Sequence, residues 1–166
     1  MREFRRRIYP GPIAFLTDFR ALLARRGALR AAMRDERLDP AFRERLMLVV
    51  TGVNQCRYCS YVHAREALGA GVPPKEIEAL AAGALVGSPP DEAPALLYAQ
   101  HWAEADGQPD PQVRDRVLKR YGEERLQGIE AVLRMMRMAN LLGNTADYLL
   151  YRVSFGRWGA PDLSHG

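Results

Sequence analysis

The segment from Glu123 to about Val153 is the feature that most restricts how this chain can fold. Its apolar residues recur at helical spacing and cover most faces of the predicted helix, whereas a surface helix of a monomer needs only one apolar stripe. These residues are Ile129, Val132, Leu133, Met135, Met136, Met138, Leu141, Leu142, Leu149 and Leu150. We therefore predict a long helix that is either central to the fold or lies at a subunit interface.

Start and stop residues predict further helices upstream. Asp39 and Pro40 supply an N-cap and a first-turn proline, and the helix that follows is expected to be buried and to end at Gly52. Asn54 is expected to cap the next helix, which ends at Gly69. The predicted helices fall within residues 12–27, 39–52, 54–68, 72–87, 88–107, 110–122 and 123–153.

The chain is expected to be one all-α domain. It has 166 residues, no alternating strand pattern and no internal repeat. A domain of this size buries roughly 70% of its unfolded surface, so it does not need disulfides to fold. We predict an N-terminal helical segment over residues 1–38, a helical core over 39–153 and a loose C-terminal tail over 154–166.

Charge and hydropathy narrow the classes of partner. The net charge is +4 at pH 7, and the tightest basic cluster, MREFRRR at the N-terminus, is expected to be a solvated arm. No motif indicates nucleic-acid binding. The longest apolar run, Ala79 to Gly87, is far shorter than the about 20 residues that a membrane span needs. We expect a cytoplasmic protein with no nucleic-acid partner and no membrane segment.

Both cysteines of the chain lie in the stretch NQCRYCSYVH, together with a histidine. In a helix, residues three apart share a face with Cα atoms about 5 Å apart, within the range that a disulfide accepts. Cys56 and Cys59 are therefore expected to form a disulfide reversibly, and His63, one turn beyond Cys59, to reach its sulfur. Helix N-termini and neighbouring imidazoles lower a thiol pKa from about 8.5, which favours the nucleophilic thiolate.

Two other interpretations of this stretch remain open. The cysteines are plausible as buried structural residues beside a hydrogen-bonded histidine. They also supply, with His63, three of the four ligands of a structural zinc site, for which His101 or Glu44 is the available fourth ligand. In the cytoplasm thiols are kept reduced, so Cys-x-x-Cys favours a redox, catalytic or metal-binding role.

The stretch RERLMLVVTGVNQCRYCSYVHAREALGAGVPPKEIEAL resembles the core of the alkylhydroperoxidase AhpD and carboxymuconolactone decarboxylase-like family. That pattern has a glutamate, then Cys-x-x-Cys twelve residues later, then a histidine four residues after the second cysteine. Glu44, Cys56, Cys59 and His63 match it. The resemblance implies an AhpD-like helical bundle that forms a homo-oligomer, a trimer or a hexamer.

The resemblance also implies a thiol-dependent peroxidase or disulfide oxidoreductase. Cys59 attacks the peroxide, Cys56 resolves it to a disulfide, and His63 and Glu44 relay protons. Cys56 lies nearer the helix start and the preceding loop, so we expect it to be the more accessible sulfur and the one that an external dithiol attacks. The implied reductant is a dithiol or a lipoyl-bearing protein, and neither a cofactor nor a metal is expected. The alternatives are a relative that acts on a lactone or small organic acid, and a non-enzymatic or metal-binding helical module.

Other polar residues are weaker candidates. Tyr58 stands where the best-known peroxidases of this family have a histidine, and a phenol does not shuttle protons near neutral pH as imidazole does. Asn140, Asn144 and Asp147 follow one face of the last helix, where they are expected to hydrogen-bond between helices or subunits, or to line a pocket. His101 is expected to be packed or at the surface.

Overall fold

The computed structural model describes residues 4, 6–34 and 37–159, and the regular structure in these residues is entirely helical. The helices are α1 (Pro12–Ala24), α2 (Arg26–Met33), α3 (Pro40–Asn54), α4 (Arg57–Gly69), α5 (Pro74–Ala81), α6 (Ala93–Glu104), α7 (Pro111–Tyr121) and α8 (Glu123–Val153). The predicted fold class, all-α, is confirmed.

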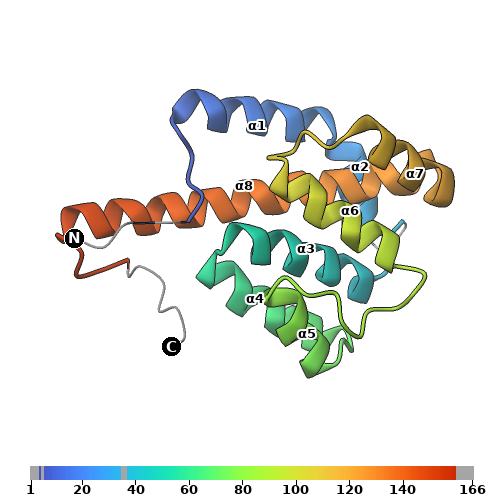
Figure 1. Ribbon diagram of the computed structural model, residues 1–166. Helices are drawn as coiled ribbons and strands as arrows, with labels where there is room; N and C mark the ends of the chain where they lie inside the picture. The colour runs from blue at the N-terminus through green and yellow to red at the C-terminus, as the bar shows by residue number, and fades with distance from the viewer. Residues whose placement is uncertain (1–3, 5, 35–36, 160–166) are drawn as a thin grey trace.

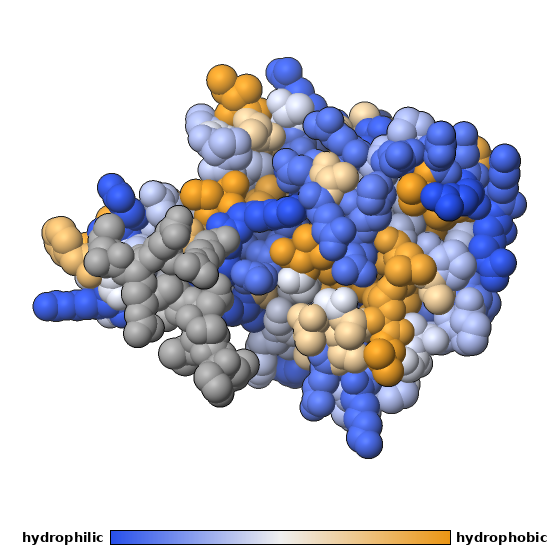
Figure 2. Space-filling model, viewed as in Figure 1, coloured by the Kyte–Doolittle hydropathy of each residue, from blue (hydrophilic) through white to orange (hydrophobic). Residues whose placement is uncertain are grey.

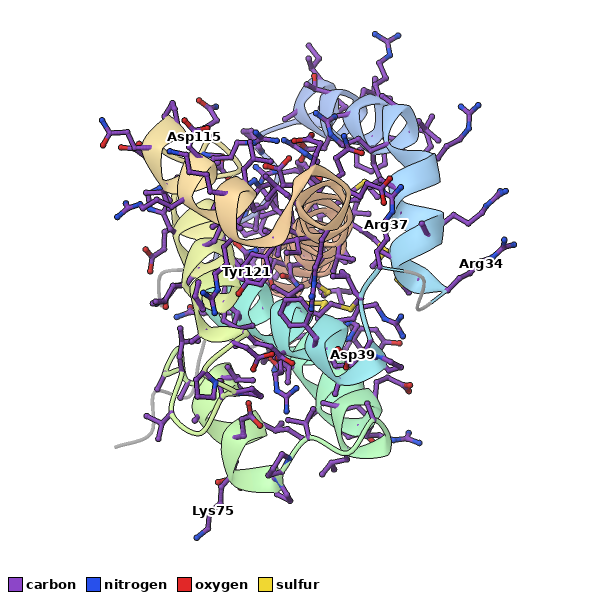
Figure 3. All side chains as sticks on the ribbon, turned by 90° about the vertical axis from the view of Figure 1, so that its right-hand side faces the viewer. Arg34, Arg37, Asp39, Lys75, Asp115 and Tyr121 are labelled. Atoms are coloured by element: carbon purple, nitrogen blue, oxygen red, sulfur yellow. A yellow bond between two sulfur atoms is a disulfide. The ribbon has the colours of Figure 1, made fainter. Side chains whose placement is uncertain are left out.

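Helix α8 is the axis of the bundle, as its sequence predicts. Figure 1 shows α1 along one side of α8 and α3, α4 and α5 on the other, with the C-terminal end of α8 extending past the other helices. Figure 3 looks nearly along α8 and shows it enclosed by α1 and α2, by α6 and α7, and by α3. Leu126, Ile129 and Leu133 are fully buried in its N-terminal half. The alternative that α8 also forms a subunit interface stays a prediction.

Helix α3 is the second buried element. Asp39, labelled in Figure 3, caps it by accepting a hydrogen bond from the Phe42 backbone N–H at 3.1 Å, as predicted. The apolar run Leu46–Val50 is buried, also as predicted. The helix does not end at Gly52, however. A Cβ on Gly52 would lie 3.0 Å from the Leu80 carbonyl oxygen, so this glycine permits α5 to approach rather than ending α3.

Three further helix boundaries differ from prediction. The expected first helix breaks at Arg25, where the backbone leaves helical geometry, and a separate α2 follows. Asn54 does not cap α4, because it is the last residue of α3 and its side chain donates a hydrogen bond to Asn140 on α8. The helix predicted within residues 72–87 stops at Ala81, because Gly83 takes a positive φ of 81°.

The described part of the N-terminal arm is hydrogen-bonded to the helices and is not a free arm in solvent, contrary to prediction, although Arg7 itself is exposed. Arg6 is 4% exposed and donates to the Asp147 carboxylate at 2.6 Å, while Arg7 donates to the Ala103 carbonyl at the end of α6. The Tyr9 backbone N–H donates to Thr145 Oγ1. Residues 6–9 are called here the N-terminal strap. The strap lies on α8 because the side chains of Asp147, Thr145 and Asn144 form hydrogen bonds with it. Residues 1–3 and 5 lie outside the described part.

A buried ionic cluster holds α5 and the start of α6 against α3. Arg45 donates to both carboxylate oxygens of Glu76, at 2.8 and 3.2 Å, and to Glu92 at 3.2 Å. Burial raises the pKa of the Glu92 carboxyl despite the positive charge of Arg45. Because Arg45 follows Glu44 directly on α3, the cluster fixes the segment of α3 that carries Glu44.

Large apolar side chains remain exposed on α1 and α8. Figure 2 shows apolar residues, in orange, on the surface of the face in view. Helix α1 has no buried residue. The exposed apolar residues of α1 and α8 are Ile13, Leu16, Phe19, Leu23, Leu142, Leu149, Leu150 and Val153. Such surfaces are typical of protein contacts, and the expected homo-oligomer stays a prediction. None of the described helices is long and apolar enough to cross a bilayer.

Candidate active site at the turn between α3 and α4

The two cysteines lie where α3 ends and α4 begins. Gln55 takes a left-handed conformation, with φ of 56° and ψ of 40°, and turns the chain between the helices. Cys56 is the N-cap of α4, and its Sγ accepts a hydrogen bond from the Cys59 backbone N–H at 3.4 Å. The capping function expected of Asn54 is therefore carried out by a cysteine sulfur.

Cys56 and Cys59 form a disulfide, with their Cα atoms 5.3 Å apart. This separation agrees with the helical geometry expected from the sequence and lies within the range of roughly 4.4–6.8 Å that disulfides accept. The first turn of α4 therefore accommodates the bond.

The two cysteine residues differ in exposure, and in the direction opposite to expectation. Cys56 precedes the helix and was expected to be the more accessible, but it is 1% exposed, whereas Cys59 is 6% exposed. The reason is the packing of α8. A Cβ on Gly143 of α8 would lie 3.0 Å from Cys56 Sγ, so any other residue there would force α8 or the sulfur to shift.

His63 and Glu44 form the second part of the site. His63 Nδ1 lies 2.8 Å from Glu44 Oε2, and their side chains are 18% and 9% exposed. When Glu44 is ionised its carboxylate only accepts hydrogen bonds, so Nδ1 is then the donor in this pair and Nε2 is the nitrogen without a proton. The pair joins α3 to α4, and His63 lies one turn beyond Cys59 on α4. The structure thus pairs Cys56 with Cys59 and His63 with Glu44, and α4 carries both Cys59 and His63.

A polar face of α8, formed by Asn140, Gly143, Asn144 and Asp147, holds the turn that carries the cysteines. Asn140 donates to Thr51 Oγ1 and accepts from Asn54 Nδ2, each at 3.2 Å. Asn144 donates to the Asn54 carbonyl at 2.7 Å and to the Arg7 carbonyl of the N-terminal strap at 2.9 Å. The expectation that these amides hydrogen-bond between helices is confirmed.

Asp147 ends this face and receives two guanidinium groups. Arg57, the first residue of α4, donates to it at 3.1 Å, and Arg6 donates from the N-terminal strap. Burial alone raises the pKa of the Asp147 carboxyl, but the hydrogen bonds and charges of Arg6 and Arg57 outweigh burial and lower it. The carboxylate therefore stays ionised between the strap and α4.

The sequence analysis did not identify two residues that surround the cysteines, Gly143 and Arg57. Gly143 was not singled out, although it follows Asn140 by three residues and therefore lies on the same face. Arg57 was hidden between the cysteines as an ordinary basic residue. The signal that locates Gly143 is its spacing with Asn140, Asn144 and Asp147 on one helix face.

Two other predicted candidates lie apart from this chemistry. Tyr58 is 75% exposed, so its phenol is in solvent and not beside the buried sulfurs. His101 Nε2 accepts a hydrogen bond from the Asp110 backbone N–H at 3.1 Å, at the entry to α7. Among the described residues, no three His, Cys, Asp or Glu side chains are placed to hold a metal ion.

Comparison with known proteins gives one family. The model of the carboxymuconolactone decarboxylase family matches residues 19–105, more than half of the chain. The match contains Glu44, Cys56, Cys59 and His63, whereas Gly143 and the rest of α8 lie outside it. No curated protein and no solved structure matches the chain.

Proposed function

Because the chain belongs to the carboxymuconolactone decarboxylase family and its cysteines form a disulfide beside a glutamate–histidine pair, we propose that it is a thiol-dependent peroxidase. It reduces hydroperoxides at the expense of a dithiol, in the manner of AhpD-like proteins. The observation that carries the proposal is the Cys56–Cys59 pair on one helical turn, with His63 one turn beyond.

In the first step Cys59 is the nucleophile. His63 Nε2 takes the thiol proton, and the Cys59 thiolate attacks the terminal oxygen of the hydroperoxide. The O–O bond breaks, Cys59 becomes a sulfenic acid, and the departing alkoxide takes a proton from His63 and leaves as an alcohol. Glu44 holds the imidazole with Nε2 available and stabilises its protonated form.

In the second step Cys56 resolves the sulfenic acid. Its thiolate attacks the Cys59 sulfur, the S–O bond breaks, and hydroxide leaves as water after taking a proton. The Cys59 backbone N–H that contacts Cys56 Sγ favours the thiolate form of Cys56. A dithiol then reduces the disulfide to two thiols. For the whole cycle, one hydroperoxide and one dithiol give one alcohol, one water and one cyclic or protein disulfide.

The test is hydroperoxide consumption with a panel of dithiol donors: dithiothreitol, dihydrolipoamide, a dihydrolipoyl-bearing protein domain and reduced thioredoxin. Hydrogen peroxide and two alkyl hydroperoxides of different bulk serve as oxidants. We expect turnover that requires both a dithiol and a hydroperoxide. Absence of turnover with every donor overturns the proposal and favours chemistry on a lactone or small organic acid.

A further inference from the structure

The two sulfurs of the disulfide have unequal surroundings. The ideal Cβ position at Gly143 lies 3.0 Å from Cys56 Sγ but 4.0 Å from Cys59 Sγ. The α8 backbone therefore packs directly on Cys56 and less closely on Cys59. The exposed fractions agree, since Cys56 is 1% exposed and Cys59 is 6% exposed.

Helix α8, which covers Cys56, is hydrogen-bonded to residues on both sides of it. Asn144 fixes the Asn54 carbonyl just before Cys56, and Asp147 accepts from Arg57 just after it. Asn140 is fully buried and adds a hydrogen bond to Thr51. Because these contacts come from one helix, exposing Cys56 requires α8 to move away from the turn as a whole.

The helix cap makes the same sulfur the better leaving group. Cys56 Sγ is at the N-terminus of α4 and already accepts the Cys59 backbone N–H. Negative charge at this position is favoured by that N–H and by the helix dipole. In thiol–disulfide exchange, the sulfur whose thiolate is more stable leaves faster. The packing of α8 on Cys56 and the capping of α4 by its sulfur therefore both favour Cys56 as the leaving group.

From these observations we infer that an external thiol attacks Cys59 and that Cys56 leaves as a capped thiolate beneath α8. The attacking thiolate forms a new S–S bond to Cys59 Sγ as the Cys59–Cys56 bond breaks, and the electron pair of that bond remains on Cys56. The second thiol of the dithiol then attacks the external sulfur, which releases Cys59. Each protein thiolate finally takes up a proton.

This inference rests on the proposed function for its place in the cycle. It assigns both half-reactions to one sulfur, because Cys59 meets the hydroperoxide and later the reductant. It also replaces our sequence-based expectation that the external dithiol attacks Cys56. Peroxide and thiol must then act in alternation and not together.

Wild-type protein provides the first test. The oxidised protein is mixed with 2-mercaptoethanol, a monothiol that cannot complete reduction from within the same molecule. The reaction is quenched with acid, and the protein is unfolded, alkylated and mapped by mass spectrometry. We expect the mercaptoethanol adduct on Cys59 and the alkyl group on Cys56 in most of the trapped species. The reverse distribution overturns the inference.

Single-cysteine variants provide a second test. Reduced Cys56→Ser, which retains Cys59, is expected to react with 5,5′-dithiobis(2-nitrobenzoate) at least about tenfold faster than reduced Cys59→Ser, which retains Cys56. The two rates should become similar in guanidinium chloride, where α8 no longer covers either thiol. Equal rates in the native proteins, or faster labelling of Cys56, contradict the inference. Neither test uses peroxide, so failure of the peroxidase proposal remains separate from failure of this one.

Discussion

Substituting Gly143 measures how closely α8 packs on the disulfide. The added Cβ of Gly143→Ala would lie 3.0 Å from Cys56 Sγ, against the about 3.5–4.0 Å of ordinary carbon contacts. Either α8 or the Cys56 sulfur must therefore shift, and overpacking of this kind costs about 1–3 kcal/mol. Alanine in place of glycine in a helix returns about 1 kcal/mol through helix propensity. The net change is expected to lie between about zero and 2 kcal/mol of destabilisation.

Gly128 offers a matched control on the same helix. A Cβ there would lie 3.5 Å from Arg37 side-chain carbons and 3.6 Å from Ala32 Cβ, which are ordinary contacts. Gly128→Ala should therefore gain the propensity term without the overpacking cost. The difference between the two variants isolates the overpacking term, about 1–3 kcal/mol.

The assay is thermal unfolding of both variants in the oxidised form at one protein concentration. For a chain of this length, 1 kcal/mol corresponds to about 2–4 °C in Tm, so Gly143→Ala should unfold about 2–12 °C below Gly128→Ala. We also expect displacement of Cys56 Sγ to slow disulfide closure, so that sulfenic acid persists on Cys59. If Gly143→Ala is as stable as Gly128→Ala, α8 does not pack on Cys56 as described.

Three further expectations concern the surroundings of the site and the subunit surface. Tyr58→Phe should leave peroxide turnover nearly unchanged because the phenol is 75% exposed, and a large loss would show that the hydroxyl takes part. Asp147→Asn should lower the free energy of unfolding at pH 7 by about 1 kcal/mol, because it removes the charge that Arg6 and Arg57 bind. The ionised carboxylate contributes this stability above its unfolded pKa of about 3.9, and the contribution is lost as pH falls through the lowered folded pKa. Denaturant unfolding at pH 7 and pH 3 should therefore show a gap between the two proteins that is smaller at pH 3, and a gap independent of pH would contradict this reasoning. The exposed apolar residues of α1 and α8 predict a homo-oligomer, and light scattering that gives the 18.7 kDa mass of one chain would refute it.

The helices were most predictable where local chemistry fixes them. Asp39 and Asp110 each precede a proline and cap α3 and α7, the cap by Asp39 as predicted, because N-capping depends on neighbouring residues alone. The apolar residues of α8 located the axis of the bundle, since covering most faces of a helix requires neighbours on most sides.

Tertiary contacts explain the boundaries that the sequence did not predict. Asn54 is a good capping residue, but its amide is used by Asn140, and the cap passes to Cys56. Gly52 resembles a helix stop, whereas it serves the approach of α5. In both cases the deciding partner comes from a helix distant in sequence, so local propensity gave the wrong residue.

The candidate site was predictable in its residues and less so in its geometry. The spacing of Cys56, Cys59 and His63 on one helix implied a shared face, and the family resemblance added Glu44, whose contact with His63 the structure shows. The relative burial of the two sulfurs could not be predicted, because it depends on Gly143 of α8. The spacing places Gly143 on the polar face of α8, but it does not indicate which of the two sulfurs that face contacts.

The most direct measurement of the central claim is peroxide consumption by the wild type and the two single-cysteine variants, combined with sulfenate trapping. The wild type should consume one hydroperoxide for each dithiol oxidised. Cys59→Ser should consume none, and Cys56→Ser should consume one equivalent and carry the trapped sulfenate on Cys59. If both variants retain wild-type turnover, the Cys56–Cys59 pair does not perform the reaction and the redox account is wrong.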